Sequence, residues 1–188
     1  MGFKIIDNFL SDFDSLRDYC DQVNYDGVTN PADNVFYDGV TLDIPDAVQK
    51  EVIQNLTEVM GRKVTLNSIF MRLSKQFTPC PHQAHTDKLM GNFSLMLYLN
   101  RLEDCEGGTT LVIHKEGLIN STPINDKQFK VWQRDVNTPD AWQITDISQM
   151  LPNRACIFDA NLMHRAEPIG GFGDSPQNAR LVLTAFYD

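Results

Sequence analysis

The sequence predicts a mainly β protein, a sandwich or barrel with a layer of helices on one side. Two observations lead to this prediction. The first 62 residues contain two segments with helical features, and six short runs rich in β-branched and aromatic residues follow, separated by turn residues. Helices followed by a run of strands are typical of folds with separate helical and β layers. We therefore expect a single domain over 1–188, with a helical support region at 1–62 and a β core at 63–188.

The N-terminal part is expected to form one short strand and two helices. The strand lies within 3–9, which reads FKIIDNF. Ser11 precedes Asp14 at capping-box spacing, which predicts that the first helix begins there. The second helix is expected to be capped by Asp46, because apolar residues recur after it at helical spacing, and Gly61 is expected to end it.

The β core is expected to contain the runs KVTLNSIFMRL (63–73), NFSLMLYLN (92–100), TTLVIH (109–114), QFKVWQRDV (128–136), RACIFD (154–159) and RLVLTAFY (180–187). The segment 115–150 is long for a connection between strands, and we interpret it as an inserted hairpin or lid near the mouth of the barrel. Trp132 and Trp142 are candidate substrate-facing aromatics within it, although packing against the protein is the favoured alternative.

Charge and cysteine usage exclude several classes of protein. The net charge of −9 argues against nonspecific binding to nucleic acid or to an anionic membrane, and it favours a basic or neutral partner. The longest apolar runs are too short to span a bilayer. The four cysteines are widely spaced and form no CxxC pair, so we expect reduced thiols and a cytoplasmic location.

The stretch HQAHTD (82–87) is the first candidate site. In an extended chain, residues two apart face the same way, so His85 and Asp87 can offer an imidazole and a carboxylate to one metal ion. His164 follows a predicted strand and a short connection, where a residue at the barrel mouth would lie. Two histidines and one carboxylate on one face are the ligands of non-haem Fe(II) oxygenases.

The C-terminal run supplies a second candidate site. Alternation along RLVLTAFY places Arg180 and Thr184 on one face among apolar neighbours. A charge in such a setting needs a partner, and a guanidinium that binds a carboxylate provides one. Tyr98 lies on the polar face of NFSLMLYLN, from which its hydroxyl can reach the same carboxylate.

These motifs together resemble the prolyl-hydroxylase-like branch of the 2-oxoglutarate/Fe(II) dioxygenases. The resemblance covers about residues 64–188 and is carried, in the family's order, by HTD (85–87), LYLN (97–100), EGGTTLVI (106–113), ACIFDANLMHRAEPI (155–169) and RLVLTAFYD (180–188). It implies a double-stranded β-helix, a jelly-roll or cupin-like barrel, with the N-terminal helices packed on its outer sheet.

The same resemblance implies roles for particular residues. His85, Asp87 and His164 are the expected Fe(II) ligands, Arg180 binds the distal carboxylate of 2-oxoglutarate, and Tyr98 and Thr184 lie beside that carboxylate. The implied reaction uses O₂, hydroxylates a C–H bond and releases succinate and CO₂, with ascorbate as a candidate further requirement. The sequence leaves the substrate open between a peptide, a free amino acid such as proline, and a small metabolite.

Two other functions stay open at this point. One is a cupin-like metal-dependent dioxygenase or isomerase that does not use 2-oxoglutarate, and the pairing of Arg180 with Tyr98 argues against it. The other is a non-catalytic barrel used for binding, and the intact set of three metal ligands argues against that.

Overall fold

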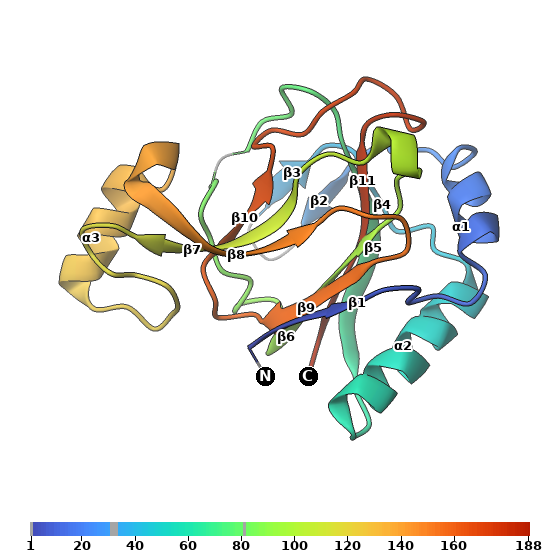
Figure 1. Cartoon of the computed structure of the whole chain (residues 1–188), viewed down its shortest axis with the longest axis horizontal. Coiled ribbons are helices and arrows are strands. Elements are labelled where there is room, and N and C mark those ends of the chain that lie inside the picture. Colours follow the sequence, from blue (N-terminus) through green and yellow to red (C-terminus); the bar gives the residue numbers. More distant parts are fainter. Residues whose placement is uncertain (1, 31–33, 81) are drawn as a thin grey trace.

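The computed structural model describes residues 2–30, 34–80 and 82–188. Its largest element is a six-stranded antiparallel sheet with the strand order β1-β9-β6-β11-β5-β4 (Figure 1). The strands are β1 (Phe3–Ile6), β4 (Val40–Thr41), β5 (Leu66–Ser74), β6 (Phe93–Tyr98), β9 (Ala155–Asp159) and β11 (Arg180–Tyr187).

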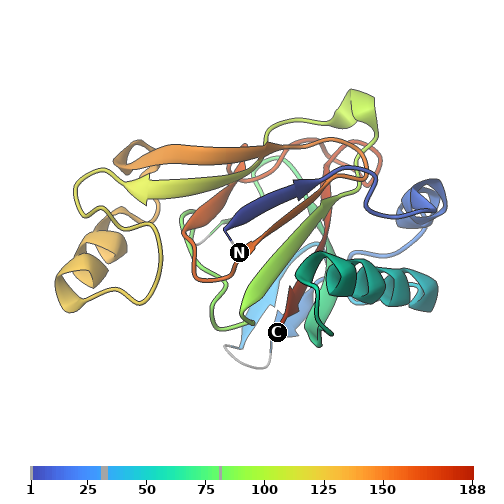
Figure 2. The ribbon, with the colours of Figure 1, turned by 60° about the horizontal axis from the view of Figure 1, so that its bottom comes forward.

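A second antiparallel sheet of three strands has the order β10-β7-β8. It consists of β7 (Gly108–His114), β8 (Trp142–Gln149) and β10 (His164–Glu167), and a separate hairpin pairs β2 (Val28–Asn30) with β3 (Val35–Tyr37). Figure 2 shows β7 and β8 extending side by side towards one end of the molecule. Side chains of β6 and β11 form hydrogen bonds with backbone of the three-stranded sheet, so the two sheets face each other. This arrangement is the predicted jelly-roll barrel.

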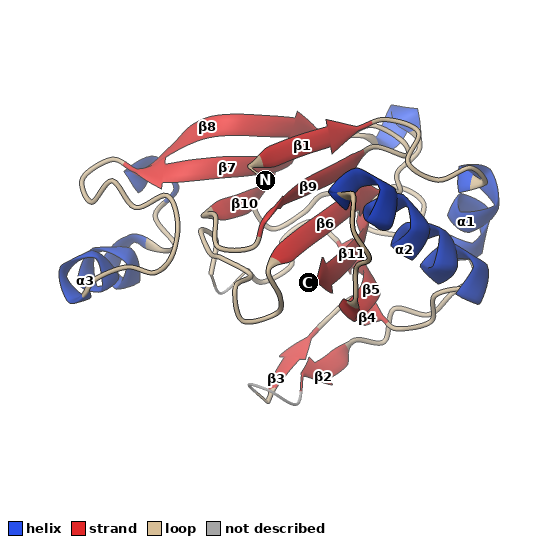
Figure 3. Ribbon diagram, turned by 90° about the horizontal axis from the view of Figure 1, so that it is seen from below, coloured by secondary structure: helices blue, strands red, loops and turns tan. Residues whose placement is uncertain are grey.

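Helices α1 (Phe13–Cys20) and α2 (Asp46–Met60) cover the outer face of the large sheet, whereas α3 (Asp126–Asp135) lies at the opposite end of the molecule (Figure 3). Two 3₁₀ turns, η1 (Leu102–Asp104) and η2 (Pro139–Ala141), complete the elements. The main core lies between the two N-terminal helices and the large sheet, and its buried members include Leu16, Cys20, Val52, Leu56, Leu95, Leu97, Leu181, Leu183 and Tyr187. Truncating one such leucine to alanine typically costs about 2–5 kcal/mol.

The two N-terminal helices occur where the sequence predicts them, but their caps differ. Asp12 caps α1 by accepting a hydrogen bond from the Ser15 N–H, so the prediction that Ser11 caps this helix is wrong by one residue. Asp46 is the first residue within α2 rather than its cap, and there its charge faces the positive end of the helix dipole. Gly61 ends α2 in the left-handed conformation, with φ of 65°, as predicted.

The run QFKVWQRDV (128–136) is the clearest error of prediction, because it forms most of α3 instead of a strand. Asn125 and Gln128 form a reciprocal capping box, in which each side chain accepts a hydrogen bond from the other residue's backbone N–H. This box satisfies donors that a helix otherwise leaves unpaired at its start. The segment 115–150 thus contributes α3 and the strand β8, and whether any part of it acts as a lid stays a prediction.

Strand β11 is the centre of the large sheet and is buried along its whole length. Its outward residues, among them Leu181 and Leu183, belong to the main core under the helices. Its inward residues, Arg180, Val182 and Thr184, face the interior of the barrel, as the alternation predicts. One strand therefore provides both the packing of the fold and part of the candidate site.

A glycine fixes the start of β7 against β8. Gly108 has φ of 150° and pairs with Gln149, and a Cβ at this position would collide with the backbone carbonyl of Ser148. Only glycine meets both requirements without displacing the neighbouring strand. No helix among the described parts of the chain is long and apolar enough to cross a membrane.

Candidate metal centre

The backbone brings together two histidines that are far apart in the sequence. His164 is the first residue of β10, and His85 lies opposite it in an isolated antiparallel bridge. The His85 N–H donates to the His164 carbonyl over 3.1 Å, and the His164 N–H donates to the His85 carbonyl over 2.9 Å. Asp87 lies two residues further along, where its N–H donates to the Ala160 carbonyl over 2.8 Å. Main-chain hydrogen bonds therefore fix the relative positions of all three residues.

The side chains of His85, Asp87 and His164 converge as predicted. One carboxylate oxygen of Asp87 lies 3.6 Å from Nε2 of His85, and the other lies 3.2 Å from Nε2 of His164. Each residue offers one ligand atom, and these atoms all lie within 4.8 Å of one another. Imidazole nitrogens and carboxylate oxygens bind a divalent ion such as Zn²⁺ at about 2.0–2.2 Å. Ligand atoms on one face of the ion therefore lie about 3 Å apart. The observed spacing fits one ion with small adjustments.

The hydrogen bonding of His164 provides an independent test of this fit. Its side chain is 4% exposed, and its Nδ1 lies 3.0 Å from the Leu162 carbonyl, which assigns the hydrogen to Nδ1. In the neutral ring, Nε2 then carries a lone pair beside the Asp87 carboxylate oxygen 3.2 Å away, and no described residue donates a hydrogen bond to it. An unpaired buried acceptor is unfavourable unless something binds it. A metal ion bound here would satisfy this nitrogen.

Electrostatics keep Asp87 and His85 in the form that binds metal, whereas for His164 burial lowers the pKa but the Asp87 carboxylate outweighs it and raises the pKa of the ring. Burial alone would raise the pKa of Asp87, but the two imidazoles and the Ser94 hydroxyl outweigh it and hold the pKa at about 2. Burial and the neighbouring His164 lower the pKa of His85 to about 4. At neutral pH the aspartate is therefore ionised and His85 is neutral, as a metal ligand must be.

A further residue supports the carboxylate. The hydroxyl of Ser94 on β6 donates to Asp87 over 2.9 Å, and Ser94 is fully buried. Such outer partners fix the orientation of metal ligands. Ser94 received no role in the sequence analysis, although alternation along β6 places it on the same face as Tyr98, which was the available signal.

Helix α3 braces the segment that leads to His85. The indole N–H of Trp132 donates to the Ala84 carbonyl over 3.0 Å, and its ring stacks on His82. Trp132 thus packs against protein here. Trp142 is 4% exposed and lies edge-on to His114, so packing also accounts for the second tryptophan.

Arg180 lies inside the barrel as predicted and is 6% exposed. Among the residues described, its guanidinium forms one hydrogen bond, a long one of 3.4 Å from Nη2 to the Gly108 carbonyl, and its Nε has no partner. A buried guanidinium with so few acceptors is suited to bind an anion.

Tyr98 and Thr184 share this face with Arg180, but other groups occupy their hydroxyls. The Tyr98 hydroxyl donates to the Ser148 carbonyl over 2.8 Å, which links the two sheets. The Thr184 hydroxyl lies 3.3 Å from the sulfur of Met96. Tyr98 pairs with Val182, two residues from Arg180, so the structure places both candidates near the arginine.

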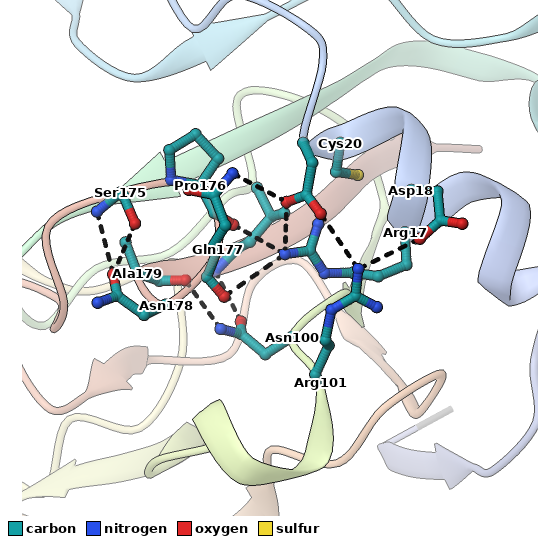
Figure 4. Close-up of polar contacts among 12 residues, drawn as sticks. Arg17, Asp18, Cys20, Asn100, Arg101, Ser175, Pro176, Gln177, Asn178 and Ala179 are labelled. Atoms are coloured by element: carbon teal, nitrogen blue, oxygen red, sulfur yellow. Dashed lines mark hydrogen bonds and ion pairs between the residues drawn. The ribbon is translucent and has the colours of Figure 1, made fainter.

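Asn100 holds the backbone on both sides of Arg180. Its Nδ2 donates to the Ala179 carbonyl and its Oδ1 accepts from the Leu181 N–H, both over 2.8 Å (Figure 4). In the same view, Arg17 of α1 points towards the loop before β11 and donates to the Pro176 carbonyl over 2.9 Å. The loop that presents Arg180 is therefore held by Asn100, two residues after β6, and by Arg17 of α1.

The other two histidines, His82 and His114, lie outside the triad. His114 is buried, with Nε2 3.0 Å from Asp135 and with Nδ1 accepting from backbone N–H groups of Glu116 and Gly117. His82 stacks on Trp132. Both rings serve the packing of the segment 115–150 against the barrel.

Comparison with known proteins gives one family and a common fold. A family model described as "Family of unknown function (DUF6445)" matches residues 3–187. No curated protein matches the sequence.

Several solved structures are similar over almost the whole chain. The non-heme alpha ketoglutarate dependent epimerase SnoN from nogalamycin biosynthesis is 12% identical with a TM-score of 0.61, and the match covers 100% of this chain and 77% of SnoN. EctD from S. alaskensis, with 2-oxoglutarate and 5-hydroxyectoine, is 14% identical with a TM-score of 0.59, covering 100% and 72%. AviO1 from Streptomyces viridochromogenes Tue57 is 12% identical with a TM-score of 0.57, covering 99% and 89%. At these identities the similarity establishes the fold.

Proposed function

The chain belongs to the DUF6445 family, and we propose that it is an Fe(II)- and 2-oxoglutarate-dependent oxygenase. One observation carries the proposal: His85, Asp87 and His164 place three ligand atoms within 4.8 Å of one another, and no described residue donates a hydrogen bond to the buried Nε2 of His164. The fold supports it, because structures similar to this chain include EctD with bound Fe and EctD with 2-oxoglutarate.

In this proposal the protein holds one metal ion on one face. His85, Asp87 and His164 are the ligands, and a set of two histidines and one carboxylate leaves coordination positions open for the cosubstrate and O₂. Ser94 orients the carboxylate, and the Leu162 carbonyl orients the ring of His164. The chain's own work is to keep Asp87 ionised and His85 neutral and to fix all three ligands in position.

Arg180 is the proposed receptor for the distal carboxylate of 2-oxoglutarate. Its buried guanidinium lacks a carboxylate partner among the described residues, and an Arg–carboxylate pair is bidentate and charge-assisted. Thr184 lies on the same face. For Tyr98 to take part, its hydroxyl must exchange its bond to Ser148 for one to the cosubstrate.

Bound iron would supply the oxidation of a substrate C–H bond by O₂, coupled to conversion of 2-oxoglutarate to succinate and CO₂. We propose hydroxylation of an amino-acid side chain, free or peptidyl, as the reaction, following the resemblance to the prolyl-hydroxylase-like branch. Ascorbate would serve to keep the iron reduced. SnoN is an epimerase with this fold, so release of succinate alone does not establish hydroxylation. The product formed from the substrate must also be identified.

Anaerobic titration of the metal-free protein with Fe(II), followed by 2-oxoglutarate, tests the proposal. The wild type should bind one iron and then develop the charge-transfer absorption of an iron–2-oxoglutarate complex. His164→Ala and Asp87→Ala should lose tight iron binding. His82→Ala is the matched control, because His82 lies outside the triad, and it should bind like the wild type. Unchanged iron binding in His164→Ala would overturn the metal centre.

The cosubstrate is tested separately from the metal. Arg180→Ala should keep the iron but bind 2-oxoglutarate about one to three orders of magnitude more weakly, because losing one partner of a desolvated charge pair costs about 2–5 kcal/mol. If iron binds and 2-oxoglutarate affinity does not change, the protein is a metal-dependent barrel enzyme of another kind, such as a cupin-like dioxygenase or isomerase.

A further inference from the structure

A second arginine faces the interior of the barrel beside Arg180. Arg72 lies on β5 directly opposite Val182 of β11, and opposite residues of paired strands point to the same face. Arg180 is two residues from Val182 on that same face, so the two arginines are diagonal neighbours. Tyr98 pairs with Val182 from the other side, which places Arg72 and Tyr98 in one row across the sheet.

Arg72 differs from most arginines of this protein in having no acidic partner. Five others form ion pairs, namely Arg17, Arg101, Arg134, Arg154 and Arg165. Within residues 2–30, 34–80 and 82–188, no carboxylate pairs with Arg72, and its buried Nε has no hydrogen-bond partner. Among the described residues, Arg72 and Arg180 thus share both the inner face and the lack of an acidic partner.

Two unpaired guanidinium groups in this position repel each other. Burial and the positive charge of Arg72 lower the pKa of Arg180, although Tyr98 acts in the opposite direction. One anion cannot neutralise both groups. With Fe(II), Asp87, 2-oxoglutarate and Arg180, the charges in the barrel sum to zero, so the charge of Arg72 is left over. This count rests on the proposed function.

The position of Arg72 indicates which anion it takes. The hydrogen bond from Ser94 to Asp87 marks the metal end of β6, and the row of Tyr98, Val182 and Arg72 lies between that end and Arg180. Arg180 is 6% exposed, whereas Arg72 is only partly buried. Arg180 therefore suits a cosubstrate enclosed in the barrel, and Arg72 suits a molecule that enters from solvent.

We propose that Arg72 binds a carboxylate of the substrate, so that the substrate is an organic acid, such as an amino acid with a free α-carboxylate, and not an internal residue of a peptide. The net charge of −9 suggested a basic or neutral partner, but salt screens the exposed surface charges, whereas the two arginines lie on the inner face of the barrel and are screened less. A single guanidinium at this place would select acids over their amides, because the amide lacks the charge.

Binding to protein loaded with Zn(II), a diamagnetic and redox-inactive substitute for Fe(II), tests this without turnover. The probe is acetate, added after 2-oxoglutarate has saturated the protein, and the readout is the NMR shift of the arginine Nε–Hε signals. In the wild type, acetate should shift the Arg72 signal. Arg72→Gln should weaken acetate binding about tenfold or more but leave 2-oxoglutarate affinity within about threefold. Arg62→Gln is the matched control at an exposed arginine, and it should change neither acetate binding nor 2-oxoglutarate affinity.

Two results would overturn the assignment. Acetate binding that is the same in Arg72→Gln and the wild type would show that Arg72 is not an anion site. A loss of 2-oxoglutarate affinity in Arg72→Gln as large as that in Arg180→Gln would show that both arginines hold the cosubstrate. Failure of 2-oxoglutarate to bind the wild type would instead refute the proposed function, and the acetate titration would still report on Arg72.

Iron-loaded enzyme gives a further check: N-acetyl amino acids should stimulate succinate release, and the corresponding N-acetyl amino-acid amides should not.

Discussion

Replacing Asn100 with alanine would remove the side chain that holds the backbone around Arg180. Asn100 is 1% exposed, and its amide forms two hydrogen bonds of 2.8 Å, one to the Ala179 carbonyl and one from the Leu181 N–H. The substitution leaves both backbone groups buried and without these partners. It changes no apolar contact of the main core, so the lost hydrogen bonds dominate the effect.

The magnitude follows from the number of groups left unpaired. Each buried donor or acceptor without a partner costs about 1–3 kcal/mol, so two of them cost about 2–6 kcal/mol. Water that enters the space left by the amide can satisfy part of this demand. We therefore expect Asn100→Ala to lower the free energy of unfolding by about 2–4 kcal/mol.

Urea denaturation measures this change, and Asn24→Ala is the matched control, because Asn24 is exposed and a surface substitution typically changes stability by less than about 0.5 kcal/mol. Hydrogen exchange of the Leu181 amide provides a local readout and should become faster in Asn100→Ala. A loss of stability no larger than that of the control, with unchanged protection of Leu181, would refute the reasoning.

Three further predictions concern the barrel and its braces. Gly108→Ala should prevent folding or reduce stability severely, since the new Cβ meets the neighbouring strand, whereas Gly61→Ala has open space and should lose only about 1 kcal/mol; equal urea midpoints would contradict this. Trp132→Phe removes the indole hydrogen bond to Ala84 and should cost about 1 kcal/mol in urea unfolding, and an unchanged midpoint would mean that helix α3 does not brace this segment. Ser94→Ala should reduce metal affinity about 10–100-fold, and wild-type affinity in a metal titration would remove Ser94 from the site.

The features that the sequence predicted best were those with a local physical cause. Alternation in RLVLTAFY predicted that Arg180 lies inside the barrel. The strand is buried on both faces, and Arg180 lies on the face opposite to that of Leu181 and Leu183. The spacing of His85 and Asp87 predicted that both side chains face one ion, and their ligand atoms do converge. The same alternation predicted that one face of β11 packs in the core and that the other contributes to the site.

The errors arose where two patterns compete or where a contact is long-range. Phe129 and Val131 alternate as in a strand, but the capping box of Asn125 and Gln128 favours a helix, and the helix packs Trp132 on the barrel. Asn100 could not be assigned from its neighbours in sequence, because its partners belong to β11 and the preceding loop. Such contacts follow from the strand order, which no local pattern specifies.

The central place of β11 has a consequence for how the chain folds as it is synthesised. Its pairing partner β5 leaves the ribosome roughly 110 residues earlier, which at about 5–20 residues per second leaves β5 waiting about 5–25 s for that partner. During this time the apolar residues Met71 and Leu73 of β5 have no complete core to enter. The barrel can close only once the chain has been made as far as Tyr187, so the nascent protein passes through a long interval in which chaperones or misfolding can act on the exposed edge of β5.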